Sequence, residues 1–491
     1  MIGRIKSLLL ENQTTKQTVA KNTFWLFFGN ILSKLIKAAI LIYAVRVLSV
    51  EGWGVFSYAL SIAGLFTIFI DFGINAVITR ESIHNLEDQQ KYFSTALGIK
   101  LVMAAVIGVV ILVLSPFFIS QSAVVALLPI VVLIVIFDSL RDFGAALSRA
   151  WEKMEIEAVV QIVTNLIIVI AGFVALSLVP QAKSLAIGYV IGTGLGMLVA
   201  FYPFRRYFKG LLASFSPNLI KKILYSSWPF GMLGVMGAIM LNTDTVMVGW
   251  FRSITEVGYY GAAQRVIQLV YLVPGLIATA LFPSMAKLIE NKERFKNVLE
   301  RGLSLLTLFA VPATVGGVLL GRDIIGITFG SQYIPATGSF RLMCLTFLPI
   351  FLSAIFGNAV FALNKEKKLI AYVVLGVIGN FLFDLILIPL WGIDGAALST
   401  VINQTIITLY LIYVLRKEFH FSVLKQLDKI VLATIIMGIG VVIFRYIGLH
   451  VYLLTAIGLS LYLASLYLLR EQALNEVIGG FKKFLKPSPQ L

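Results

Sequence analysis

Residues 101–119 read LVMAAVIGVVILVLSPFFI and contain no charged side chain. An apolar run of about 20 residues is long enough to cross the ~30 Å hydrocarbon core of a bilayer as a helix. Comparable runs recur along the chain, and the alternating pattern of outer-membrane strands is absent from the sequence. The sequence therefore predicts an all-α polytopic membrane protein.

Composition supports the same class. Of the 491 residues, 59% are hydrophobic and only 13% are charged, whereas about 25% of a typical soluble domain is charged. This excludes a soluble enzyme, a disordered chain and a disulfide-rich secreted module. The single cysteine, Cys344, excludes an intramolecular disulfide and a thiolate metal cluster. We find no spacing typical of catalytic residues, a metal site or a cofactor site, and we expect a protein that is not an enzyme.

Fourteen apolar stretches are candidate membrane helices. Their ranges are 19–48, 53–79, 93–119, 122–148, 156–179, 184–204, 223–250, 256–285, 302–321, 334–363, 369–390, 393–415, 429–446 and 451–469. We expect an N-terminal six-helix lobe in residues 1–210, a second six-helix lobe in 211–418, and two extra helices with a tail in 419–491.

The charges in the connections predict the orientation. The connections on one side, with both chain ends, contain 29 of the 40 Lys and Arg residues, and the opposite connections contain four. The positive-inside rule places the first set in the cytoplasm, so we expect a protein of the cell membrane with both termini cytoplasmic. The net charge of +16 is then explained by topology, and we predict no nucleic-acid partner.

Two short turns suggest an internal repeat. Residues 49–56 read SVEGWGVF and residues 254–260 read ITEVGYY. Aligning Gly54 with Gly258 gives an offset of 204 residues, about six spans. Repeated six-helix units are common in secondary transporters.

Several short motifs resemble prokaryotic polysaccharide flippases of the O-antigen type, within the multidrug/oligosaccharidyl-lipid/polysaccharide exporter superfamily. They are residues 46–48 (RVL), 71–73 (DFG), 79–81 (TRE), 244–249 (DTVMVG), 256–260 (EVGYY) and 392–397 (GIDGAA). The resemblance covers the whole chain. It implies two six-helix lobes around a central cavity, two further helices, and translocation of lipid-linked oligosaccharides to the outer leaflet.

Seven cations fall inside predicted spans, where an ionisable group is costly unless it is paired or faces water. They are Lys34, Lys37, Arg46, Lys100, Arg141, Arg265 and Arg341. Lys34 and Lys37 lie three residues apart and share a helical face. We expect them to line the cavity and bind the phosphate or pyrophosphate of the substrate, with Arg265 and Arg341 as further cavity cations. The alternative for Lys34, Lys37 and Arg341 is snorkelling, in which the charged end of the side chain extends to the membrane interface.

The remaining intramembrane polar residues have less specific interpretations. Asp244 and Arg265 flank one turn at similar depth and could form an ion pair, either as a gate or as a fixed strut. Gln264 and Gln268, four residues apart, suit sugar hydroxyls or interhelical hydrogen bonds.

Two more carboxylates are candidates for gating or ion coupling. Asp71 lies near Asn75 and Arg80, and Asp384 lies four residues from Asn380. For Lys100 we expect anchoring at the membrane interface, and for the cluster of Asp138, Arg141 and Asp142 we expect local pairing.

These observations favour a flippase for a polyprenyl-(pyro)phosphate-linked oligosaccharide that works by alternating access. The expected partners are the lipid-linked substrate, membrane lipids, a coupling H⁺ or Na⁺, and other polysaccharide assembly proteins. The alternative is an ion-coupled multidrug exporter of the same superfamily, whose cationic substrates would favour acids in the cavity. A membrane glycosyltransferase or ligase would need catalytic acids and larger outer loops.

Overall fold

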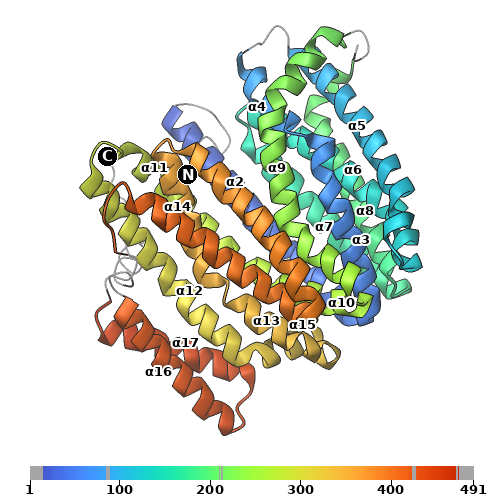
Figure 1. The fold of residues 1–491 in the computed structure, drawn as a ribbon. Coiled ribbons are helices and arrows are strands. Elements are labelled where there is room, and N and C mark those ends of the chain that lie inside the picture. The colour runs from blue at the N-terminus through green and yellow to red at the C-terminus, as the bar shows by residue number, and fades with distance from the viewer. Residues whose placement is uncertain are drawn as a thin grey trace, which may run out of the picture. The chain divides into compact units, whose positions relative to one another are not determined.

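The computed structural model describes residues 15–84, 89–209, 211, 214–422, 427–471 and 474. Within these ranges the chain forms helices and no strand (Figure 1), which confirms the predicted all-α class. Thirteen helices in the described part are long and apolar enough to cross a membrane. The two chain ends, which the charge pattern assigns to the cytoplasm, lie outside the described residues.

The chain divides into two compact units, Met1–Gly261 and Ala262–Leu491. The helices that begin in the first unit are α2 (Thr15–Val47), α3 (Val50–Asp71), α4 (Ile74–His84), α5 (Gln89–Phe118), α6 (Ser122–Ala150), α7 (Met154–Leu178), α8 (Ala182–Phe201), η1 (Tyr202–Phe208), α9 (Pro217–Phe251) and α10 (Ile254–Val270). Those that begin in the second unit are α11 (Leu272–Lys287), α12 (Lys292–Phe329), η2 (Ser331–Ala336), α13 (Thr337–Cys344), α14 (Phe347–Ala362), α15 (Glu366–Arg416), α16 (Leu427–Tyr446) and α17 (Val451–Leu468). The three-part division at residues 210 and 418 stays a prediction.

The long helix α15 is a hairpin of two membrane-length segments. Its 51 residues would span about 76 Å as one helix, more than twice the hydrocarbon thickness. The backbone turns at Gly392 (φ 59°, ψ −133°). Ser399 donates to the Asn380 carbonyl and Asn403 donates to the Gly376 carbonyl, so the two segments run antiparallel. The two spans expected at 369–390 and 393–415 are thereby confirmed.

The spans expected at 53–79, 256–285 and 334–363 are confirmed as candidate membrane spans at Val50–Glu81, Ile254–Lys287 and Ser331–Ala362. Each of them contains a break in the helix. After α3, Phe72 and Gly73 both adopt positive φ, and α4 follows in a new direction. A Cβ on Gly73 would lie 2.5 Å from the Ser227 carbonyl oxygen, so the break packs directly on the α9 backbone. In the second unit, the breaks at Tyr271 and Thr346 are joined by a hydrogen bond between their hydroxyls.

The two turns of the proposed repeat pack against each other. A Cβ on Gly54 would overlap the Ile254 carbonyl oxygen, and a Cβ on Gly258 would overlap the Val50 carbonyl oxygen. Residues 50 and 254 are separated by the same 204 positions as the two glycines. The contact is therefore reciprocal between positions that share the offset of 204 residues.

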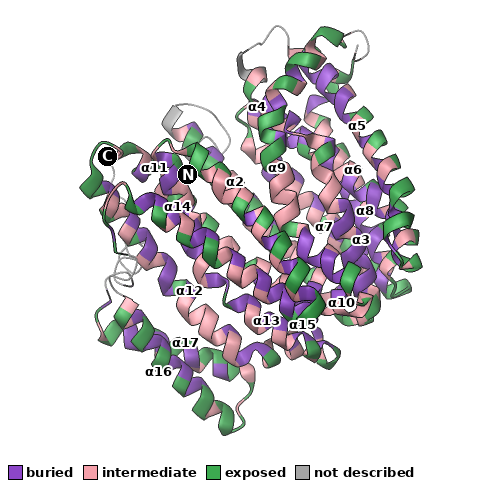
Figure 2. Ribbon diagram, in the orientation of Figure 1, coloured by how far each residue is buried: buried purple, intermediate pink, exposed green. Residues whose placement is uncertain are grey.

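Small residues also set the packing of α7 against α8. A Cβ on Gly188 would lie 2.7 Å from the Gly172 Cα, and a Cβ on Gly192 would lie 2.8 Å from the Ile168 nitrogen. Gly188 and Gly192 lie four residues apart, a small-xxx-small spacing that lets two helix backbones approach closely. Figure 2 shows exposed positions along the outer sides of helices such as α5, where apolar side chains face away from the bundle.

We predict that Gly54→Ala and Gly258→Ala each destabilise the protein by about 1–3 kcal/mol, because each adds a methyl group where two backbones touch. Both substitutions separate the same helix pair, so the double variant should lose clearly less than the sum of the two. Thermal unfolding in detergent measures the losses. Gly237→Ala, where nothing lies within 4 Å, is the control and should keep full stability; strictly additive losses would contradict the reciprocal contact.

Candidate functional site

Lys34 and Lys37 occupy different environments on α2. The helix is fixed to α7 near its start by an ion pair between Lys21 and Glu155 at 3.1 Å. Lys34 is exposed and makes no ion pair among the described residues. The Lys37 ammonium is partly buried and lies 5.1 Å from the ring centroid of Tyr189 on α8. Lys34 is therefore the member of the pair that is available to an anionic ligand.

The α6 helix contains a local cluster of charged side chains. Arg141 forms ion pairs with Asp138 at 2.6 Å and with Asp142 at 2.8 Å, which confirms the local pairing expected there. The Arg141 guanidinium is thus paired with carboxylates of its own helix. Tyr189 is a neighbour of Lys37 that the α2 sequence alone could not indicate.

Another ion pair joins α6 to α7. Arg149 donates to Glu157 at 2.9 Å, and Gln161 donates to the same carboxylate at 3.4 Å. The Glu157 side chain is almost fully buried, at 6% exposed, while that of Arg149 remains 34% exposed. This pair is balanced, so it leaves no charge for an external ligand.

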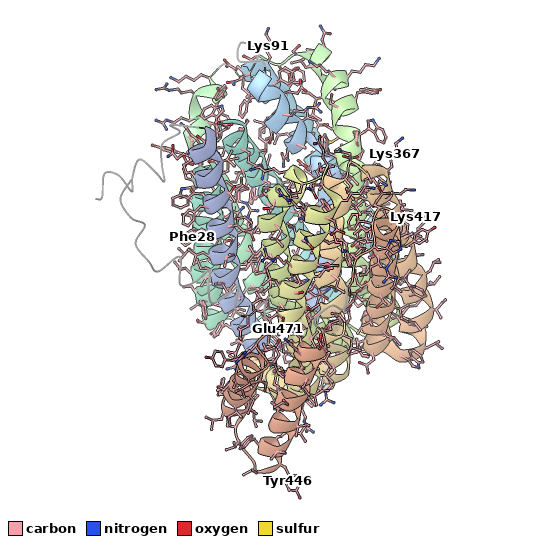
Figure 3. All side chains as sticks on the ribbon, turned by 90° about the vertical axis from the view of Figure 1, so that its left-hand side faces the viewer. Phe28, Lys91, Lys367, Lys417, Tyr446 and Glu471 are labelled. Carbon is pink, nitrogen blue, oxygen red and sulfur yellow. The ribbon has the colours of Figure 1, made fainter. Side chains whose placement is uncertain are left out.

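Aromatic side chains accompany the exposed face of α2. Phe24 and Phe28 stack with their ring centroids 5.7 Å apart and their planes within 10°. Trp25 makes edge contacts with both rings. Figure 3 labels Phe28 on this helix. A flat apolar surface thus precedes Lys34 by two to three helical turns.

Lys100 corrects one expectation. Its side chain is fully buried and not at the membrane interface; its ammonium donates to Asp71 at 2.6 Å and to Asn75 at 2.9 Å. The break after α3 places Asn75 in the first turn of α4, where its backbone N–H also donates to the Asp71 carboxylate. The position of Lys100 along α5 could not reveal this burial, because the residues that pair with it come from α3 and α4.

The candidate gate residues have partners within their own units. Asp244 is buried and accepts a hydrogen bond from the Tyr260 hydroxyl at 2.6 Å. In the second unit, Arg265 donates to Gln268 at 3.1 Å, and Gln264 is half-buried. Asp244 and Tyr260 lie eight residues before and eight residues after Arg252, so their equal distance from the turn could have indicated this pair. An Asp244–Arg265 pair stays a prediction.

The other two candidates lie in the second unit. The Arg341 stem packs on α12, where a Cβ on Gly321 would lie 3.0 Å from its Cγ. Its Nε is buried without a hydrogen-bond partner among the described residues. Asp384 is fully buried within the α15 hairpin, one turn from Asn380. Both side chains are ionisable groups at positions where charge is costly.

We predict that Lys100→Met destabilises the protein by about 3–5 kcal/mol, because Asp71 would lose its buried counter-charge. The double variant Lys100→Met/Asp71→Leu removes both charges and should recover most of this loss. Thermal unfolding of the three variants in detergent tests the coupling. A double variant no more stable than Lys100→Met would show that the pair is not coupled.

Comparison with known proteins gives a family and a fold. The sequence model of the family described as polysaccharide biosynthesis protein matches residues 19–289, more than half of the chain. The lipid II flippase MurJ of Bacillus subtilis is 22% identical over 482 residues, covering 87% of this chain and 88% of that protein. The capsular polysaccharide biosynthesis protein CapF of Staphylococcus aureus is 21% identical over 412 residues, covering 82% of this chain and 100% of that protein.

Two solved structures share the fold. A lipid II flippase MurJ in an inward closed conformation superposes with a TM-score of 0.74, at 19% identity, over 90% of this chain and 97% of that one. An inward-facing multidrug resistance MATE family transporter of the MOP superfamily superposes with a TM-score of 0.61, at 13% identity, over 85% of this chain and 97% of that one.

Proposed function

This chain belongs to the polysaccharide biosynthesis protein family, and from that premise we propose that it is a membrane flippase for polyprenyl-(pyro)phosphate-linked oligosaccharides. It moves the saccharide head group from the cytoplasmic to the outer leaflet by alternating access. The observation that carries this function is the similarity, over more than four fifths of the chain, to proteins named as a lipid II flippase and a capsular polysaccharide biosynthesis protein.

Lys34 supplies the chemistry that such a substrate needs. An ammonium within a membrane span needs a counter-charge or water, and the described residues give Lys34 no ion pair. A substrate phosphate provides that counter-charge. Lys37, held over Tyr189, adds positive potential one turn away. Arg265 and Arg341 would contact the remaining phosphate oxygens, and Gln264 and Gln268 the sugar hydroxyls.

Three acids, Asp244, Asp384 and Asp71, would govern the conformational cycle. Asp244, bonded to Tyr260, would pair with Arg265 in one conformation and release it in another. Asp384 would bind a coupling H⁺ or Na⁺, because a fully buried carboxylate is stabilised by a proton or a cation. Asp71, held by Lys100, would maintain the α3–α4 break through the cycle.

We place this translocation in the cell membrane. The chain is a multi-pass membrane protein, and the excess of Lys and Arg in one set of connections supports cytoplasmic termini. The substrate would come from enzymes that build the lipid-linked glycan, so polysaccharide assembly proteins are the natural partners. The multidrug alternative has weaker support, because the MATE transporter superposes less well than MurJ and cationic drugs would be repelled by Lys34.

We predict that Lys34→Ala lowers translocation by about 10- to 100-fold, the range of one lost hydrogen bond to a charged group. Lys34→Arg keeps the charge and should retain most of the activity. Surface glycan and inner-leaflet lipid-linked glycan are measured in a deletion strain that expresses each variant at matched levels. Arg46→Gln removes an exposed cation from the end of the same helix and is the control. Normal export by Lys34→Ala/Lys37→Ala would refute the phosphate site.

We predict that Asp384→Asn abolishes the stimulation of translocation by an ion gradient and leaves the rate without a gradient unchanged. Proteoliposomes with a Na⁺ gradient or a pH gradient alone distinguish the two ions. Asp323→Asn is the matched control, since Asp323 pairs with Arg445 at the end of α12. Full gradient stimulation of Asp384→Asn would remove this residue from the coupling mechanism.

A further inference from the structure

A cavity of about 220 Å³ lies within the first unit, between α3, α5 and α9. All the side chains that line it are uncharged, and most are aliphatic or aromatic. Its hydroxyl groups are those of Tyr58 and Ser115. The cavity is therefore suited to hydrocarbon and not to a sugar or a phosphate.

The cavity has the form of a slot along the helices. Its lining extends from Tyr58 to Phe66 on α3 and from Ile111 to Ile119 at the end of α5. Eight residues correspond to about 12 Å of helix. The α3 and α9 helices run antiparallel, since a Cβ on Gly249 would overlap the Tyr58 ring and a Cβ on Gly234 would overlap Ile68. This places Trp250, next to Gly249, at the Tyr58 end.

The slot is buried at its base and open at its rim. Ile111 and Ser115 are 2% and 7% exposed, whereas Phe118 and Trp250 are 65% and 63% exposed. Leu114, also in the lining, is 44% exposed. In a multi-pass membrane protein such a surface meets the bilayer, so the slot is continuous with the protein–lipid interface.

Ser115 adds one polar feature at a defined level. Its Oγ is buried and has no hydrogen-bond partner among the described residues. α5 ends three residues later, at Phe118, so the hydroxyl lies about 5 Å inside the helix end. Trp250 marks the same end, and tryptophan is enriched at membrane–water interfaces. The ester groups of a glycerolipid lie just inside this interface.

We propose that the slot is a binding site for one acyl chain of an ester-linked glycerolipid. The acyl chain extends from Ser115 past Ile111 toward Phe66, and the ester carbonyl accepts a hydrogen bond from the Ser115 hydroxyl. The glycerol and head group remain beside Trp250. The polyprenyl phosphate of the flippase substrate has no carboxylic ester to accept this bond, so the occupant is a bilayer lipid. A bound acyl chain fills the space between α3, α5 and α9 and stabilises their packing.

The test uses the purified full chain in nanodiscs of phosphatidylglycerol with a photoactivatable diazirine on one acyl chain. After irradiation, peptide mapping should place the label on residues 58–66 and 111–119. Ile111→Trp fills the base and should lower this labelling at least fivefold, and Ser115→Ala should lower it about threefold, as one neutral hydrogen bond predicts. Leu112→Trp adds the same ring one position away, outside the lining, and should label normally.

Three results would overturn the proposal. One is unchanged labelling in Ile111→Trp, and another is equal labelling at exposed positions such as Val106. The third is loss of the label on addition of excess polyprenyl phosphate but not of unlabelled phosphatidylglycerol, since that would assign the slot to the substrate tail. If Ile111→Trp does not fold, Ile62→Phe fills the slot from α3 and gives the same expected decrease.

Discussion

A charge placed in the hydrocarbon of a bilayer must meet a counter-charge, a hydrogen bond or water. In the first unit this constraint organises the polar interior. Lys100 is neutralised by Asp71, Arg141 by Asp138 and Asp142, and Arg149 by Glu157. Lys34 differs, because its environment offers no ion pair within the described residues. Ion pairs connect the helices, and in the function that we propose the exposed Lys34 ammonium binds the anionic substrate.

The backbone supplies the second requirement of a transporter, which is helices that can move as segments. Residues 72 and 73 break one span, Tyr271 and Thr346 mark two others, and Gly392 turns α15 back on itself. Backbone groups at these breaks keep hydrogen bonds, since the Phe72 N–H donates to the Ile68 carbonyl and the Thr346 N–H donates to the Met343 carbonyl, as membrane interiors require. The reciprocal contact of Gly54 and Gly258 adds a joint between equivalent turns of the repeat.

The sequence predicts the features that depend on composition averaged over about 20 residues, such as apolar spans. Apolar runs identified the membrane spans, including the hairpin at Gly392, and short motifs identified the superfamily. It predicts less well the features that depend on a single backbone angle. The positive φ of Phe72 has no signal in the apolar pattern, and it redirects α4 so that Asn75 meets Lys100. The difference between Lys34 and Lys37 also depends on a residue 152 positions away, Tyr189, which no local spacing contains.

The central claim is that this protein moves a lipid-linked saccharide across a bilayer. Purified protein reconstituted into liposomes that contain a polyprenyl-pyrophosphate oligosaccharide in both leaflets tests it directly, with a membrane-impermeant periodate reagent added outside. We expect oxidation to proceed beyond the outer half of the substrate when active protein is present, and to stop at that half in protein-free liposomes or with Lys34→Ala/Lys37→Ala. Oxidation that stops at one half with the unaltered protein in intact, gradient-supplied vesicles would contradict it.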